Sequence, residues 1–149
     1  MEYQELHRPQ YHFTARKNWL NDPNGLVYRD GIWHLFFQHN TEATTWGKMT
    51  WGHAESRDLV HWDQVDHALY PDSLGTMFSG SAVVDKYNTA GFGEDALLAF
   101  YTAAGQFVNP QKPYTQCLAY SLDNGRTCLL YTSDAADEGL GVDLGGRRI

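Results

Sequence analysis

Residues 19–25 read Trp19-Leu20-Asn21-Asp22-Pro23-Asn24-Gly25, and local chemistry predicts a tight turn within this stretch. Pro23 fixes its own φ angle and keeps Asp22 out of the helical region, while Asn24-Gly25 readily adopts positive φ. Strings of this kind mostly connect two strands. The preceding indole favours a second interpretation, because a carboxylate held extended between Trp19 and a tight turn cannot rotate away. Asp22 is therefore a candidate functional group.

The composition of the chain is that of a globular protein. Its 149 residues make one domain at most, and 42% hydrophobic with 14% aromatic residues suffice for a core. The formal net charge of −7 comes from dispersed Asp and Glu with no basic run, so we expect no nucleic-acid groove and no polybasic membrane patch. Neutral, sugar-like partners fit this composition better, and nothing in the sequence indicates an oligomeric state.

The N-terminus lacks a charged start followed by an apolar run, and no window approaches a transmembrane length. The product stays in the cytoplasm if Met1 is the true start, and the compartment is open if the start was lost. Cys117 and Cys128 lack metal-ligand spacing, and the seven histidines form no His-Glu-x-x-His motif. We therefore expect no metal site.

Strand signals dominate the first half of the chain. Residues 26–28 and 32–37 predict a hairpin rich in β-branched and aromatic residues, and residues 51–56 and 61–65 predict two further strands around a turn at 57–60. No segment keeps a helical period of 3.6 long enough to compete. Four short strands in sequence predict an antiparallel meander.

The pattern then repeats. Residues 79–85 and 96–101 correspond to 24–28 and 33–37, while residues 118–123 and 53–58 each carry Ala-x-Ser-x-Asp before a turn. Four-strand units repeated at an offset of about 55 to 65 positions are typical of β-propeller blades. Because a blade covers its faces only by packing on neighbours, two blades cannot close a ring. The sequence therefore predicts an all-β fold, about two blades of a propeller whose larger part lies beyond residue 127.

The last residues do not continue the repeat. An aromatic strand is expected after Thr127, but Cys128-Leu129-Leu130-Tyr131 and a polar, Gly-rich run follow. This tail resembles the conceptual translation of a transposon-based sequencing-library adapter. We interpret residues 128–149 as a non-native tail and residues 1–127 as a truncated N-terminal portion of the propeller domain. One native cysteine then remains, so no intrachain disulfide is possible.

Six motifs occur in a fixed order: RPQYHF at 8–13, WLNDPNG at 19–25, WHLFFQHN at 33–40, WG at 46–47, WGHA at 51–54 and FSGS at 78–81. Together they resemble glycoside hydrolase family 32, the β-fructofuranosidases that include invertases, levanases and exo-inulinases. The resemblance covers roughly residues 8–127. It implies a five-bladed propeller with a funnel-shaped active site, usually followed by a β-sandwich.

The resemblance also implies retaining hydrolysis of a terminal β-fructofuranosyl bond of sucrose or of fructans such as levan and inulin, with Asp22 as nucleophile. This chemistry uses two carboxyl groups about 5 to 5.5 Å apart and no cofactor. Family members carry an Arg-Asp-Pro motif, whose Asp stabilises the transition state, and a Glu-Cys motif, whose Glu is the acid/base. Neither string occurs here. We therefore expect the chain as written to be inactive and its full-length parent to be a hydrolase.

Other acidic residues of this chain are alternatives for the missing acid/base that would act with Asp22. We expect each of them to face solvent or to cap a turn. These acids are Glu42, Glu55, Asp58, Asp85 and Asp123.

Six further residues match family positions that contact the sugar: Trp19, Asn21, Gln38, Trp46, Phe78 and Ser79. The resemblance implies that Asn21 bonds sugar hydroxyls, that the two indoles offer apolar faces to the fructose ring, and that Gln38 contacts the fructosyl unit. Each position also has an ordinary structural alternative: a turn-forming Asn, a packed aromatic ring or strand residue, or a satisfied core amide.

The sequence is also compatible with two other functions. The chain could derive from a carbohydrate-binding propeller that never had the acid/base, or from a fructosyltransferase that passes the fructosyl unit to a sugar. Residues 41–45 (TEATT) border the funnel entrance where relatives often have Pro and Gly. The preference for sucrose or longer fructans is therefore open as well.

Overall fold

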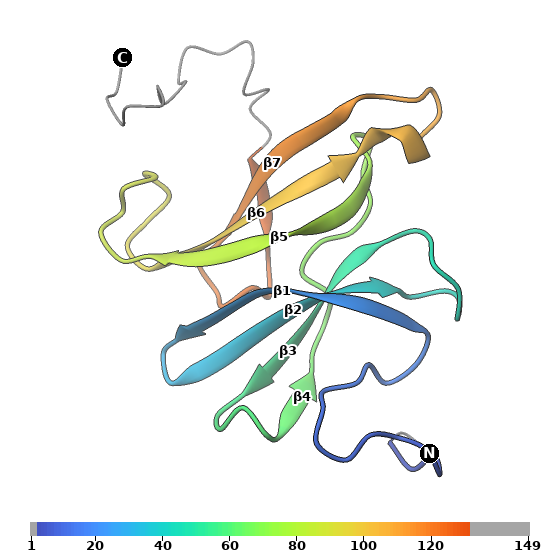
Figure 1. Cartoon of the computed structure of the whole chain (residues 1–149). Helices are drawn as coiled ribbons and strands as arrows, with labels where there is room; N and C mark the ends of the chain where they lie inside the picture. Colours follow the sequence, from blue (N-terminus) through green and yellow to red (C-terminus); the bar gives the residue numbers. More distant parts are fainter. Residues whose placement is uncertain (1–2, 132–149) are drawn as a thin grey trace.

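The computed structural model of the protein describes residues 3–131, which form two antiparallel sheets of four strands each (Figure 1). The first sheet contains β1 (Trp19–Arg29), β2 (Ile32–Asn40), β3 (Thr50–Ser56) and β4 (Trp62–Gln64), and the second contains β5 (Thr76–Asp85), β6 (Ala96–Ala104), β7 (Tyr114–Ser121) and β8 (Leu129–Tyr131). A short 3₁₀ turn, η1 (Gly105–Phe107), follows β6. In both sheets the strands lie in sequence order, which confirms the predicted all-β arrangement of two consecutive meanders.

The predicted turn at residues 22–25 is not formed, because β1 continues through this stretch. The chain bends there by two β-bulges, one on each side of Pro23-Asn24. Among the residues that the structure describes, β1 pairs with β2 alone, so it is an edge strand, a position that tolerates proline. Gly25 adopts a φ of 44° in the second bulge. The sequence signals were those of a local bend, and the pairing with β2 makes that bend part of a strand.

The other predicted strands are present with shifted ends. β2 continues to Asn40, β5 begins at Thr76 and β7 begins at Tyr114, so each is longer than its sequence pattern indicates. The added residues lie at the end of the sheets that carries Asp22, since Trp19 pairs with Asn40 in the register of β1 and β2.

The Ala-x-Ser-x-Asp repeat forms the same turn in both sheets. Ser56 Oγ donates to Asp58 Oδ1 at 3.2 Å, and Ser121 Oγ donates to Asp123 Oδ1 at 2.8 Å. Each carboxylate also accepts a backbone N–H farther along its turn, from His61 to Asp58 and from Thr127 to Asp123. The predicted repeat is therefore confirmed at the level of individual hydrogen bonds.

The hydrophobic core lies between the two sheets, where β1 and β5 run side by side (Figure 1). The fully buried Trp51 packs on Tyr101, and its Nε1 donates to the carbonyl oxygen of Phe78 at 2.9 Å. Ala82 of β5 approaches Gly25 so closely that a Cβ atom on Gly25 would lie 2.7 Å from its Cβ. These contacts fix β5 against the bulged part of β1.

The predicted boundary at residue 127 stays a prediction. Residues 132–149 lie outside the described residues, and Leu129–Tyr131 pair with β7 as the fourth strand of the second sheet, with all three side chains exposed. Cys117 and Cys128 are both free thiols. Within the described range, no helix has the length and hydrophobicity needed to cross a membrane.

Candidate active site

A bulge in β1 presents Asp22. Leu20 pairs with His39 and Pro23 pairs with Phe37, so Asn21 and Asp22 together lie opposite the single residue Gln38. Bulges of this kind re-aim side chains and are frequent beside active sites. Asp22 is exposed here, while Asn21 is partly buried.

A second bulge presents Ser79. In β5, Phe78 pairs with Thr102 and Gly80 pairs with Tyr101, which leaves Ser79 as the extra residue. Its Oγ donates a hydrogen bond to Asp22 Oδ2 at 2.7 Å, joining the two sheets. Two of the predicted site residues are thus in direct contact.

The predicted pair Trp19 and Asn21 is also in contact. Trp19 Nε1 donates to Asn21 Oδ1 at 2.7 Å. Because an indole nitrogen can only donate, this bond defines which end of the Asn21 amide is the oxygen. The amide beside Asp22 therefore has a fixed orientation.

Two buried amides near the bulge have atoms without a hydrogen-bond partner within residues 3–131. Gln38 is 2% exposed and its Nε2 has no hydrogen bond, and Asn24, equally buried, has none at either amide atom. A buried polar group without a partner costs roughly 1–3 kcal/mol. The amide of Gln38 is therefore placed to gain from a polar ligand. Sequence reasoning did not single out Asn24, because its turn propensity was a sufficient explanation.

Aromatic rings stand next to the pair of bulges. The predicted residues Trp46 and Phe78 meet edge to face, with ring centroids 6.1 Å apart. Phe107 contacts both rings, at 5.3 Å and 5.8 Å, and Tyr114 lies 5.9 Å from Phe78. Phe107 and Tyr114 were not expected, since isolated aromatic residues at the ends of a Gly- and Pro-containing loop carry no periodic signal.

Comparison with known proteins identifies the family. The sequence profile of the Glycosyl hydrolases family 32 N-terminal domain matches residues 12–136. The chain belongs to glycoside hydrolase family 32. The resemblance inferred from the six motifs is thereby confirmed.

The similar family 32 proteins are much longer than this chain. A levanase from Bacillus subtilis (strain 168) is 51% identical over 135 residues, which is 89% of this chain and 19% of the levanase. An exo-inulinase structure from Aspergillus awamori has a TM-score of 0.77 at 44% identity, covering 92% of this chain and 29% of the exo-inulinase. A fructofuranosidase from Schwanniomyces occidentalis, complexed with fructosylnystose, has a TM-score of 0.75 at 42% identity, covering 88% of this chain and 27% of the fructofuranosidase.

The acids considered as replacements for the missing partner of Asp22 have other partners. Asp58 and Asp123 cap the repeated turns, and Asp85 accepts the backbone N–H groups of Thr89 and Ala90 at 2.9 and 2.7 Å. These bonds lower the pKa of Asp85. Glu42 pairs with Lys48 and Glu55 pairs with Arg126. The turn-capping prediction is confirmed for the three aspartates.

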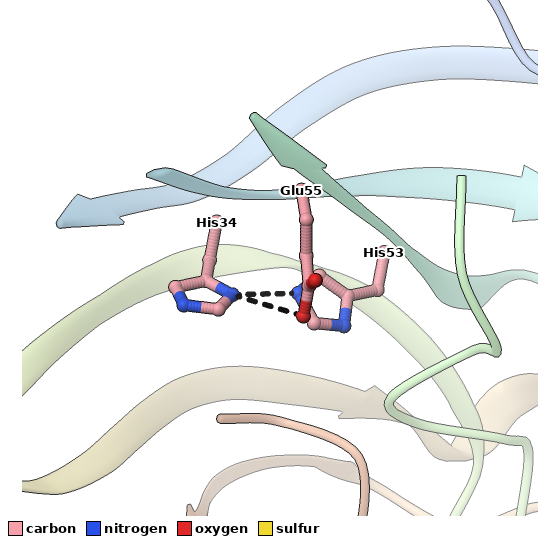
Figure 2. A group of neighbouring side chains, drawn as sticks. All are labelled: His34, His53 and Glu55. Atoms are coloured by element: carbon pink, nitrogen blue, oxygen red, sulfur yellow. Dashed lines mark hydrogen bonds and ion pairs between the residues drawn. The ribbon is translucent and has the colours of Figure 1, made fainter. Parts of the chain in front are cut away.

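A buried group of titratable residues lies in the first sheet, toward the end away from Asp22 (Figure 2). His34 Nδ1 and His53 Nε2 are 3.0 Å apart, and Glu55 Oε1 is 3.8 Å from the same His34 nitrogen. Burial lowers the pKa of His53 from 6.5 to about 3 and lowers that of His34 as well, which favours the neutral form of each ring.

The ligand atoms of His34, His53 and Glu55 lie within 4.8 Å of one another, close enough to surround a cation. The second nitrogen of each imidazole ring favours a purely structural role for the two histidines instead. His34 Nε2 and His53 Nδ1 are buried and have no partner among the described residues, whereas a metal-bound imidazole almost always donates its other N–H to an acceptor. Sequence spacing alone could not reveal this group, because it depends on His34 lying opposite Glu55 in the register of β2 and β3.

Proposed function

We propose that this chain is the N-terminal portion of a retaining β-fructofuranosidase that releases terminal β-D-fructofuranosyl units from sucrose or from fructans such as levan and inulin. The hydrogen bond from Ser79 to Asp22 is the main support, because it fixes one oxygen of an exposed carboxylate at the meeting point of two sheets. The names of the similar proteins, a levanase, an exo-inulinase and a fructofuranosidase, support this substrate class.

Asp22 is the proposed nucleophile. Ser79 holds Oδ2, so Oδ1 is the oxygen that attacks the anomeric carbon of the fructosyl unit. The bond from that carbon to the leaving oxygen breaks, and the leaving oxygen takes a proton from a second carboxylic acid. The same group then removes a proton from water, which attacks the fructosyl-enzyme, releases fructose and restores the Asp22 carboxylate.

The neighbouring residues are proposed to bind the sugar in the roles that the family resemblance implies. Asn21, with its orientation fixed by Trp19, faces the sugar hydroxyls beside Asp22. The Nε2 of Gln38, which has no partner among residues 3–131, donates a hydrogen bond to the fructosyl unit. Trp46 and Phe78 provide apolar faces for the sugar ring.

The second carboxyl group is proposed to come from further blades that follow residue 127. The sheet face that carries Val83 and Phe100 supports this, since both side chains are nearly half exposed, at 48% and 47%. Apolar residues on the open face of a blade are normally covered by the next blade. The coverage of only 19–29% of the similar proteins is consistent with such an extension.

Expression of the complete gene tests this proposal. The complete protein is expected to release fructose from sucrose and levan, and Asp22→Asn is expected to abolish that release. Asp63→Asn, an exposed acid of β4, is the matched control and should keep activity. The 149-residue chain should be inactive. Transfer of fructosyl units to sugar instead of water would identify a fructosyltransferase, and binding of fructan without release would identify a carbohydrate-binding propeller; either result contradicts the proposal.

A further inference from the structure

Trp46 lies in residues 41–49, the connection between β2 and β3, which has no regular secondary structure. Its indole is 46% exposed and meets the rings of Phe78 and Phe107 edge to face, with centroids 6.1 and 5.3 Å apart. Because much of the indole faces solvent, its direction depends on the backbone of its own loop as well as on these two rings. The residues that hold this loop therefore bear on the site.

The side chain of Asn40, the last residue of β2, binds the loop at two points. Its Nδ2 donates to the carbonyl oxygen of Thr45 at 2.8 Å, and its Oδ1 accepts the N–H of Glu42 at 3.0 Å. Asn40 is 4% exposed, so water competes little for either bond. A Cβ atom on Gly47 would lie 3.9 Å from the same Nδ2. The amide thus lies beside the backbone on both sides of Trp46.

The first residues of the loop are bonded to the segment that leads into Asp22. Asn18 Nδ2 donates to the carbonyl oxygen of Thr41, and the backbone N–H of Trp19 donates to the carbonyl oxygen of Ala43 at 3.0 Å. Trp19 is the first residue of β1, the strand that presents Asp22. The position of the loop is therefore coupled to the strand of the proposed nucleophile.

Asparagine has the chemistry that position 40 requires. The two loop groups are a carbonyl oxygen and an N–H, and one amide supplies both the donor and the acceptor that they need. An ionised aspartate could still accept the N–H of Glu42, but it would turn a negative oxygen toward the carbonyl oxygen of Thr45. That substitution keeps the size of the side chain and removes one of the two bonds.

We propose that Asn40 is a positioning residue of the active site: with the help of Asn18, its amide sets the loop so that the indole of Trp46 faces the fructosyl unit. This inference rests on the proposed function, in which Trp46 contacts that sugar. Asn40 acts through Trp46 and does not itself contact the substrate. A loop that is already in its binding conformation loses less conformational entropy when the sugar binds.

A double-mutant cycle in the complete enzyme tests this inference. We expect Asn40→Asp to lower kcat/KM for sucrose about tenfold when Trp46 is present and less than about twofold in the Trp46→Ala background, because the effect acts through the indole. Asn88→Asp controls for the added charge. Asn88 Oδ1 also accepts a loop N–H, from Gly93 at 2.8 Å, but in the connection between β5 and β6, so this variant should match wild type.

A second variant makes the test independent of the folding of Asn40→Asp. Asn18→Gly removes the bond to Thr41, and glycine suits the φ of 70° at this position, so the variant should fold. We expect it to lower kcat/KM for sucrose about threefold, and this loss should also disappear in the Trp46→Ala background. Melting temperatures verify that each variant is folded.

The outcomes separate this inference from the proposed function. Losses of equal size in both backgrounds, or no loss in either variant, would overturn the inference and leave the proposed function intact, because Asn40 would then be an ordinary structural amide. A wild-type complete enzyme that does not cleave sucrose would contradict the proposed function. An unchanged kcat/KM in Trp46→Ala alone would contradict the proposed role of that indole, and the inference would fall with it.

Discussion

Ser79 Oγ donates a hydrogen bond to Asp22 Oδ2 at 2.7 Å, although the two residues are 57 positions apart. Both lie in β-bulges, and each bulge belongs to the first strand of its sheet. Each bulge turns its side chain away from the regular strand pairing. The two side chains meet where β1 and β5 run side by side. The two sheets together therefore position a carboxylate that neither could fix alone.

Removing the Ser79 hydroxyl should impair catalysis without unfolding the protein. Ser79→Ala takes away a charge-assisted hydrogen bond of roughly 1.5–3 kcal/mol, so kcat/KM for sucrose in the complete enzyme should fall about 10- to 100-fold. Ser81→Ala, also exposed on β5, is the control. Steady-state kinetics that show the same rate for Ser79→Ala and wild type would mean that this bond does not support the nucleophile.

We expect Gln38 to lower the stability of the fold and to contribute to binding of the sugar. In Gln38→Leu an amide whose buried Nε2 has no partner in the described part of the chain is replaced by an apolar side chain of similar size. We expect unfolding of the 149-residue chain to cost the same free energy or about 1 kcal/mol more, while kcat/KM of the complete enzyme falls at least about tenfold. Urea denaturation and sucrose kinetics measure the two effects. A large loss of stability with unchanged kinetics would identify Gln38 as an ordinary core amide.

Gly25 should be essential for the contact between the sheets. An alanine there would have both a φ of 44° and a Cβ atom 2.7 Å from that of Ala82. Gly31→Ala is the matched control, because Gly31 also has positive φ, of 78°, but open space around it. We expect about 1 kcal/mol of destabilisation for Gly31→Ala and at least about 2 kcal/mol more for Gly25→Ala. Equal effects in thermal denaturation would show that the approach of Ala82 is unimportant.

The buried histidines should make the fold sensitive to acid. The folded-state pKa of His53 is lowered to about 3, whereas the unfolded chain takes up the proton near pH 6.5, so protonation favours unfolding. Stability is fully present above about pH 6.5 and declines as the pH falls toward the folded-state pKa. His53 alone should cost about 2 kcal/mol at pH 5, measured by urea denaturation at about pH 7.5 and pH 5.

The control for the pH effect is His61. The hydrogen bond to the Asp58 carboxylate raises the pKa of His61, the opposite direction, and the His61 side chain is exposed. His53→Gln should therefore make the acid-side decline shallower, with the part due to His34 and His67, whose pKa values burial also lowers, remaining. His61→Gln should leave the decline in place. A decline of unchanged slope in His53→Gln would contradict the assignment to the buried pair.

Much of the fold was predictable because its signals are local. Runs of β-branched and aromatic residues such as 32–37 indicated strands, and the Ala-x-Ser-x-Asp repeat indicated two equivalent sheets. The stretch around Pro23 gave the wrong element for a physical reason: proline and Asn-Gly favour a bend, and only pairing with β2 decides whether the bend is a turn or a bulge.

The site was predictable where residues belong to family motifs. Asp22, Ser79, Trp46 and Phe78 were expected, and the structure brings the two polar groups into one contact and the two rings into another. Their roles toward substrate stay predictions. Phe107 was not expected, because its place depends on how a loop closes between β6 and β7, and no local pattern encodes that closure.

The most direct test of the central claim is to trap the covalent intermediate. The complete enzyme would be mixed with sucrose, quenched in acid within milliseconds and digested, and the peptides would be measured by mass spectrometry. We expect a peptide containing Asp22 to gain the mass of one fructosyl unit, with the ester on that side chain, and Asp22→Asn to give no adduct. An active enzyme that carries the fructosyl unit on another residue, or forms no adduct and inverts the anomeric configuration, would contradict the account.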